Sequence, residues 1–417
     1  MTRLALPSRR AVTAIAVCVF LVECLFIRGG LLSHERFGDV ALYATDAHRM
    51  LDGQIPYRDF FVEYPPGALV TFIVPAIVST AHYTTLFKIL MAVLGAATIC
   101  VAAVVAAKLG ESPRRSAVAL AWIAITPLLL GPLLLDEYDL WPTLLACLAL
   151  LALLAGRERV GAGLLGFGAA TKVYPAAILP AALVWIYRRS GRRAAVQGLV
   201  AAAVVAATTY VVFVVLGPGG VWASVEIHLR RGLQKESLGS AVLYVLDQLG
   251  LYKAHIDETN ANWTELTGPA GDTLATVSSL CQIAAALAVA ALAVRRRPEP
   301  RTLLYATAAA VAGFVAFGKV FSPQYLIWLV PLVALAGGVI ENVALAAALV
   351  LTQLWFLRIV TPFDLDREIW LVVARDVLVV GVFVLLLNRL RLLPLATPLR
   401  EPRTASRAAD SGQGAPT

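Results

Sequence analysis

The chain has 417 residues, of which 59% are hydrophobic and only 15% are charged, and its mean hydropathy is +0.77. About a quarter of the residues in a soluble domain are charged, so this composition excludes a soluble globular protein and indicates a polytopic membrane protein. The net charge of +8 does not predict a nucleic-acid partner, because the basic residues collect in short clusters between apolar segments.

Apolar segments of helical length recur along the whole chain. The first follows two arginines but precedes no small-residue cleavage site, so we interpret it as a retained membrane helix rather than a signal peptide. Two others, 161–172 and 173–187, are shorter than the ~20 residues needed to cross a bilayer, which predicts a tilted or re-entrant hairpin. About twelve membrane helices are predicted by apolar length, near 11–28, 83–107, 116–131, 141–155, 161–172, 173–187, 194–216, 273–294, 302–317, 324–340, 343–360 and 371–388.

The charges predict which ends of these helices face the cytoplasm. Basic residues cluster at 3–10, 108–115, 156–159, 188–193, 295–301 and from 388 onward, whereas most acidic residues lie in 29–66, 132–140, 217–272 and 361–370. Because basic clusters mark the cytoplasmic side, both termini are predicted to be cytoplasmic. We expect a single membrane domain over 1–396 and a disordered cytoplasmic tail, rich in Pro, Ser, Gly and Ala, over 397–417.

Two outer loops, 29–82 and 217–272, are far longer than the connections usual in helix bundles and are therefore candidates for function. In the first loop, apolar residues between Val40 and Leu51 recur with helical spacing, and Asp39 occupies the N-cap position. The stiff, polar stretch "DGQIPYRDFFVEYPPGAL" (52–69) follows. Residues 65–80 are predicted to form a short helix on the outer membrane surface.

Acidic residues and unusual cations lie at the predicted outer face. The first loop carries Asp39, Asp46, Asp52, Asp59 and Glu63. Asp39 has two interpretations, a helix cap or a functional carboxylate at the membrane surface. Lys172, Lys319 and the cluster Arg230, Arg231 and Lys235 go against the positive-inside trend, which favours an anionic ligand such as a phosphate. Snorkelling of Lys172 to the interface and ordinary solvated charge are the alternatives.

Four stretches of this sequence, taken together, resemble a known family. "FGDVALYATDAHRMLDGQIPYRDFFVEYPPGALV" (37–70) resembles the first extracytoplasmic loop of GT-C glycosyltransferases, in particular the bacterial polyprenyl-phosphate-mannose-dependent mannosyltransferases of glycosyltransferase family 87. "GAATKVYPAAILP" (168–180), "RRGLQKESLGS" (230–240) and "FSPQYLIWLVP" (321–331) are similar to later parts of that family, in the same order.

The resemblance implies an all-α GT-C fold with the active site at the outer face. The implied reaction moves a hexose, mannose first among the candidates, from a polyprenyl-phosphate donor to a glycolipid or glycan acceptor with inversion. Asp39 matches the acidic first-loop residue that acts as general base. The tandem Asp-x-Asp of some relatives is missing, because Val40 and Ala41 follow Asp39. Asp46 therefore remains an alternative base. No metal site and no certain cofactor are predicted, and a divalent metal requirement stays open.

A lipid phosphate is a good leaving group, so this chemistry needs cations rather than a general acid. The predicted phosphate-binding residues are Lys172, Arg231 and Lys319. The predicted sugar and acceptor contacts are Tyr43, Tyr57, Glu63, Tyr64, Gln234, Glu236, Gln324 and Tyr325. The prenyl tail is expected to lie beside the short hairpin 161–187.

Two alternatives remain open from the sequence: the same chemistry with an arabinose or glucose donor, and a lipid or glycan transporter without covalent chemistry. A transporter is less favoured because its polar residues should lie near the bilayer midplane within repeated halves, whereas these lie at the outer edge. Abundant Arg, Ala and Val with few Lys suggest a GC-rich bacterial genome, hence a multi-pass protein of a bacterial plasma membrane. Membrane lipids are its expected surroundings.

Overall fold

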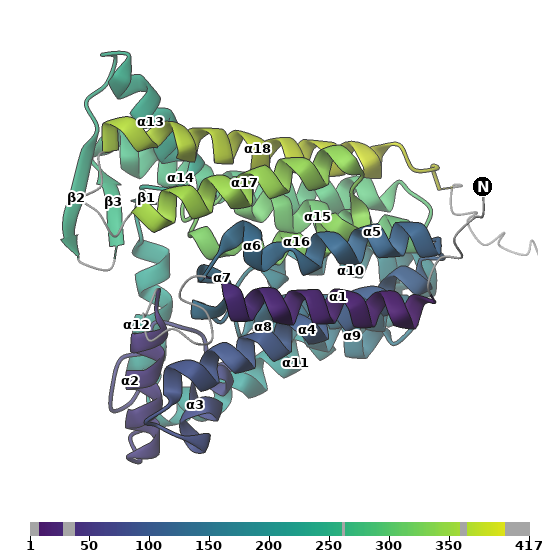
Figure 1. Ribbon diagram of the computed structural model, residues 1–417, viewed down its shortest axis with the longest axis horizontal. Coiled ribbons are helices and arrows are strands. Elements are labelled where there is room, and N and C mark those ends of the chain that lie inside the picture. Colours follow the sequence, from purple (N-terminus) through teal and green to yellow (C-terminus); the bar gives the residue numbers. More distant parts are fainter. Residues whose placement is uncertain (1–7, 28–37, 261–262, 359–364, 397–417) are drawn as a thin grey trace, which may run out of the picture.

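The computed structural model describes residues 8–27, 38–260, 263–358 and 365–396. Long helices run side by side in a bundle, and shorter elements gather at one of its ends (Figure 1). The bundle helices are α1 (Arg9–Phe26), α4 (Tyr83–Lys108), α5 (Pro113–Ala124), α8 (Leu140–Leu154), α9 (Glu158–Ala169), α10 (Pro175–Ser190), α11 (Arg192–Leu216), α14 (Pro269–Val294), α15 (Pro300–Ala316), α16 (Leu326–Ala336), α17 (Val339–Arg358) and α18 (Leu365–Arg391).

Each predicted membrane segment contains a helix. Within the described ranges, four helices are both long and apolar enough to cross a membrane by themselves, namely α4, α11, α14 and the Ile369–Arg391 part of α18. The other apolar helices are shorter, so the predicted number of about twelve spans remains a prediction. The predicted helix 116–131 is divided at Ile125 into α5 and α6 (Thr126–Leu130), because Pro127 has no backbone N–H to continue the hydrogen-bond ladder.

The loops fold into short elements at one end of the bundle. The predicted amphipathic helix is α2 (Val40–Leu51), and the predicted surface helix is η1 (Pro66–Ala68) followed by α3 (Leu69–Val78). The remaining short elements are α7 (Leu133–Asp136), α12 (Pro218–Arg230), β1 (Leu233–Gln234), α13 (Leu238–Gln248), β2 (His255–Asn260), β3 (Trp263–Thr267) and η2 (Pro323–Tyr325). The predicted loop start and the predicted disordered tail fall outside the described residues.

A small sheet corrects the all-α prediction. The strands of the second outer loop pair antiparallel in the order β1-β3-β2, with Leu233 opposite Leu266 and His255 opposite Thr267. Leu233 and Leu266 are buried in a core of their own, together with Leu243, Tyr244, Ala275 and Ile369. The strands are short and mostly polar, so hydrophobic periodicity gave no signal for them.

The basic segments meet at the end of the bundle opposite these elements (Figure 1). Arg9 donates to the carbonyl oxygen of Glu111, and Arg301 pairs with the Glu111 carboxylate at 3.1 Å. Trp185 Nε1 donates to the carbonyl oxygen of Glu299 at 3.3 Å. This arrangement agrees with the separation of basic and acidic segments that the sequence predicted. The assignment of this end to the cytoplasm remains a prediction.

Helices α9 and α11 pack closely because α9 is rich in glycine. A Cβ atom added at Gly166 would overlap the carbonyl oxygen of Ala202 and lie 2.8 Å from the carbonyl carbon and Cα of Ala202. Small residues at helix contacts allow this backbone approach in membrane proteins. The turn after α9, where Lys172 lies, is closed by the Lys172 N–H, which donates to the Gly168 carbonyl oxygen at 2.8 Å.

Gly166→Ala is expected to lower the melting temperature of the purified protein, because backbone atoms cannot yield to the added methyl group. Overpacking of this kind costs about 1–3 kcal/mol. Gly163→Ala is the matched control, since an added Cβ atom there would meet only a Val205 methyl group at the ordinary contact distance of 3.5 Å. Equal melting temperatures for the two variants would contradict the proposed close contact.

Candidate active site

Charged and aromatic side chains from five parts of the chain converge at the end of the bundle that carries the sheet. The first outer loop contributes Asp39, Glu63 and Tyr64. The other parts are the turn between α7 and α8, the turn between α9 and α10, the end of α12, and η2.

Asp39 is held by a tyrosine rather than by its helix. It occupies the N-cap position of α2, but its side chain makes no capping hydrogen bond. Instead, the Tyr64 hydroxyl donates to Asp39 Oδ2. The simple N-cap interpretation of Asp39 is therefore wrong. Tyr64 lies at the end of the stiff stretch that follows α2, directly before Pro65 and Pro66. This stretch therefore returns to the start of α2, where the Tyr64 hydroxyl meets Asp39.

Lys172 lies in an aromatic box with a buried carboxylate. Its Nζ lies 2.8 and 2.9 Å from the two carboxylate oxygens of Asp139, and Trp328 Nε1 also donates to Asp139 Oδ1 at 2.6 Å. The ammonium lies 4.5 Å from the ring centroid of Tyr138 and 5.3 Å from that of Tyr325. Its side chain is only 12% exposed, so the snorkelling alternative is wrong. Burial alone would lower the pKa of Lys172, but the adjacent Asp139 carboxylate outweighs it and raises that pKa.

Glu137 braces the turn that carries Asp39. The Tyr43 hydroxyl donates to Glu137 Oε2 at 2.7 Å, and both side chains are buried. The Glu137 carboxylate lies against Gly38, where an added Cβ atom would overlap Glu137 Oε1. The φ of +59° at Gly38 is also one that residues with a side chain rarely adopt. Burial, and secondarily the charges of Asp39 and Asp139, hold the pKa of Glu137 well above its usual range. Tyr43 is therefore a buried support of Glu137 rather than an exposed sugar contact.

Arg231 links the two outer loops. Its Nη1 lies 3.7 Å from Glu63 Oε1 and its Nε lies 3.6 Å from Glu265 Oε1. Lys319 is close by, and its Nζ donates to the carbonyl oxygen of Leu229 at 2.9 Å. Burial raises the pKa of Glu63, while the charge of Arg231 acts in the opposite direction.

The other predicted contact residues lie at the margins of this cluster. The Tyr325 ring stacks on Trp328 at 4.1 Å, and its neighbour Gln324 is half-buried. Tyr57 is buried with a φ of +66°, and its hydroxyl donates to the Tyr64 carbonyl oxygen at 2.5 Å. Gln234 Oε1 accepts from the Phe321 backbone N–H at 2.8 Å. Glu236 is buried against Arg375.

Asp46 lies two turns further along α2 and is buried. Its charge acts on Tyr57 and Tyr83, whereas the charge of Asp39 acts on Glu63, Glu137 and Asp139. The two rival bases therefore occupy different environments, and only Asp39 shares the environment of the cation cluster.

Asp46→Asn is expected to flatten the fall in stability between about pH 4 and pH 7. Burial raises the pKa of Asp46 to about 7, with Arg49 acting in the opposite direction. A raised folded-state pKa means that the stabilisation is complete below the unfolded pKa and is lost as pH rises through about 7. Melting temperatures between pH 4 and 8 check this: between about pH 4 and pH 7 the wild type should lose more stability than the variant. Parallel curves would contradict it.

Sequence reasoning missed Glu137, Asp139 and Trp328. The one signal for the two acids was the run "DEYD" (136–139) in an acidic outer segment, and nothing local pairs it with Lys172. Trp328 lies in the stretch 321–331 that carries the family resemblance, but no role followed for it from the sequence. Across the described ranges, no group of three His, Cys, Asp or Glu side chains is placed to hold a metal ion.

The described residues thus form a helical membrane bundle with a cluster of acids, cations and aromatic rings at one end. The crystal structure of ArnT from Cupriavidus metallidurans bound to undecaprenyl phosphate has a similar fold, with a TM-score of 0.51 and 15% sequence identity over 92% of this chain and 77% of that chain. A search of curated protein sequences found no significant match.

The sequence profile of glycosyltransferase family 87 matches residues 61–323, well over half of the chain. The chain belongs to glycosyltransferase family 87, and it is a multi-pass membrane glycosyltransferase. The matched range includes Glu63, Lys172 and Arg231. It begins after Asp39 and Asp46, and it ends before Gln324 and Tyr325.

Proposed function

We propose that this glycosyltransferase moves a hexose, with mannose as the first candidate, from a polyprenyl-phosphate donor to a hydroxyl of a glycolipid or glycan acceptor on the extracytoplasmic face. The observation that carries the proposal is the position of Asp39, held by Tyr64, beside a cluster that contains Lys172 and Arg231. The family and the similarity of the fold to that of ArnT, whose crystal structure is bound to undecaprenyl phosphate, support the donor class.

The proposed reaction is a single displacement. The acceptor oxygen forms a bond to the anomeric carbon while the bond from that carbon to the phosphate oxygen breaks. The polyprenyl phosphate leaves with the electron pair, and Asp39 accepts the acceptor proton. Attack opposite to the leaving group inverts the anomeric configuration. Tyr64 keeps the carboxylate oriented through its hydrogen bond.

The cations provide for the charge of the leaving phosphate. Lys172, Arg231 and Lys319 are the proposed phosphate ligands. Lys172 and Arg231 would bind the phosphate beside their present carboxylate partners, and Lys319 beside the carbonyl oxygen of Leu229. Burial raises the pKa of both Glu137 and Glu63, which makes it easier for these acids to take up a proton when an anion enters the cluster. Glu63, Tyr64, Gln324 and Tyr325 remain the proposed sugar contacts.

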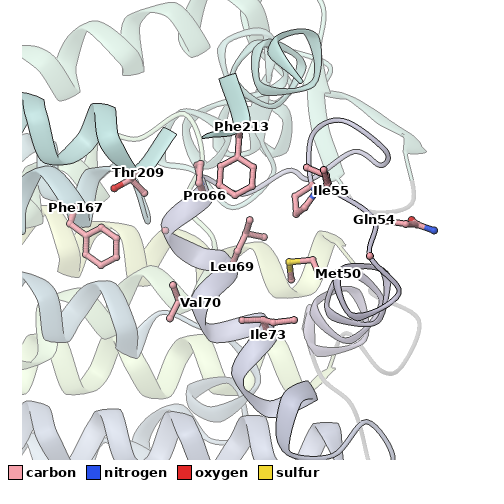
Figure 2. Close-up of a pocket in the computed structure, with 13 residues that line it drawn as sticks. Met50, Gln54, Ile55, Pro66, Leu69, Val70, Ile73, Phe167, Thr209 and Phe213 are labelled. Carbon is pink, nitrogen blue, oxygen red and sulfur yellow. The ribbon is translucent and has the colours of Figure 1, made fainter. Parts of the chain in front are cut away.

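An apolar groove is the proposed place of the prenyl tail. It has a volume of about 510 Å³ and lies between the end of α2, η1, α3, Phe167 of α9, and Thr209 and Phe213 of α11 (Figure 2). Several valines of α3 and α11 are exposed, as on a lipid-facing surface. Gly67 lines the groove, and its N–H donates to the carbonyl oxygen of Ala170 at 2.8 Å, two residues before Lys172.

The test is transfer by the purified protein in lipid nanodiscs. Polyprenyl-phosphate mannose, glucose and arabinose are compared as donors with lipid-extract acceptors, and both the released polyprenyl phosphate and the anomeric configuration of the product are measured. Mannose transfer with inversion supports the proposal. Transfer of another sugar would correct the donor alone. Movement of lipid across the membrane without release of polyprenyl phosphate would contradict the proposed transfer reaction and support the transporter alternative.

A further inference from the structure

A buried arginine joins the last helix to the second outer loop, outside the candidate active site. Arg375 lies within α18. Its Nε donates to Asp376 Oδ1 at 2.9 Å, its Nη1 lies 3.5 Å from Glu236 Oε2, and its Nη2 donates to the Glu236 carbonyl oxygen. Its Cζ lies 4.0 Å from the ring centroid of Phe321. Burying a charge in an apolar helix costs free energy, so a buried arginine with specific partners is a candidate for a functional role.

The groups that Arg375 holds are connected to the proposed phosphate ligands. The Gln234 N–H donates to the carbonyl oxygen of Lys319 at 2.9 Å, and the Phe321 N–H donates to Gln234 Oε1 at 2.8 Å. Lys319 Nζ in turn donates to the carbonyl oxygen of Leu229 at 2.9 Å. Arg231 lies between Leu229 and Gln234 along the chain. The loop 229–236 and the segment 319–321 are therefore linked by hydrogen bonds. Arg375 contacts the loop at Glu236 and the segment at Phe321.

We propose that Arg375 is a positioning residue, which fixes Arg231 and Lys319 at the phosphate site by acting through Glu236 and Phe321. The ligand class rests on the proposed function, whereas the linkage rests on these contacts alone. The planar guanidinium bonds the carboxylate and the carbonyl oxygen of Glu236 while it stacks on a ring. Lysine keeps the charge but cannot make this set of contacts.

The test compares two arginines of the same helix in the full-length protein in nanodiscs. Arg375→Lys is expected to raise the Kd for undecaprenyl phosphate, and the KM for the sugar donor, by on the order of 10- to 100-fold, because small displacements of binding groups have effects of this size. The KM for the acceptor should stay unchanged. Arg389→Lys is the control, since Arg389 is paired with Glu341 at the other end of the bundle. Its Kd should equal that of the wild type.

Glu236→Gln weakens the same contact by removing the charge that faces Arg375. This variant replaces Arg375→Lys in the test if Arg375→Lys does not fold. Because both variants break one link, the double variant should be no weaker in binding than the more affected single variant. Additive losses, an unchanged Kd, or a Kd that rises only in proportion to lost folded protein would overturn the positioning role. Failure of the wild type to bind undecaprenyl phosphate would instead overturn the proposed donor class.

Discussion

Asp39→Asn should lower the rate of sugar transfer by about 10²- to 10⁴-fold, which is the usual contribution of a positioned general base. The amide cannot accept the acceptor proton, but it can still accept the hydrogen bond of Tyr64. Expression, melting temperature and binding of undecaprenyl phosphate should therefore stay near those of the wild type. The measurement is the initial rate of transfer at saturating donor and acceptor.

Asp46→Asn is the matched control, because it makes the same change on the same helix, in a buried environment two turns away. Its transfer rate should stay close to that of the wild type at neutral pH. If Asp46→Asn abolishes transfer and Asp39→Asn does not, Asp46 is the base and the reaction class survives. If neither matters, the base lies elsewhere in the cluster, and Asp139 becomes the next carboxylate to test.

Lys172→Gln should reduce both donor use and stability, and the two effects can be separated. Removal of one partner of a buried ion pair typically costs about 3–5 kcal/mol, since Asp139 would be left buried without its cation. In addition, loss of a phosphate ligand should lower kcat/KM for the donor by about 10²- to 10³-fold, as for other groups that stabilise developing charge. Thermal unfolding and donor kinetics measure the two losses.

The double variant Lys172→Gln with Asp139→Asn distinguishes a structural lysine from a phosphate ligand. Its two neutral amides leave no unpaired charge, so much of the lost stability should return. Donor kcat/KM should stay low, because no cation is restored. Recovery of activity together with stability would show that Lys172 acts only as the partner of Asp139.

Local sequence patterns predicted most of the helices but only part of the site. The apolar spacing from Val40 gave α2 with its observed bounds, and Asp39 was singled out from its place before that helix. The sheet in the second outer loop and the division between α5 and α6 were not predicted. Short polar strands and a single proline carry weak periodic signals.

The sequence by itself determined the class, the helical segments and the separation of basic from acidic ends, because hydrophobic runs and charge clusters are local properties read along one chain. The tertiary structure alone decided which charges meet. In it Lys172 pairs with Asp139, Tyr64 bonds Asp39, and Arg375 bonds Glu236 of the second outer loop. These pairs join residues that are 25 to 139 positions apart, and a contact over such a separation depends on how whole helices pack, which no local spacing specifies.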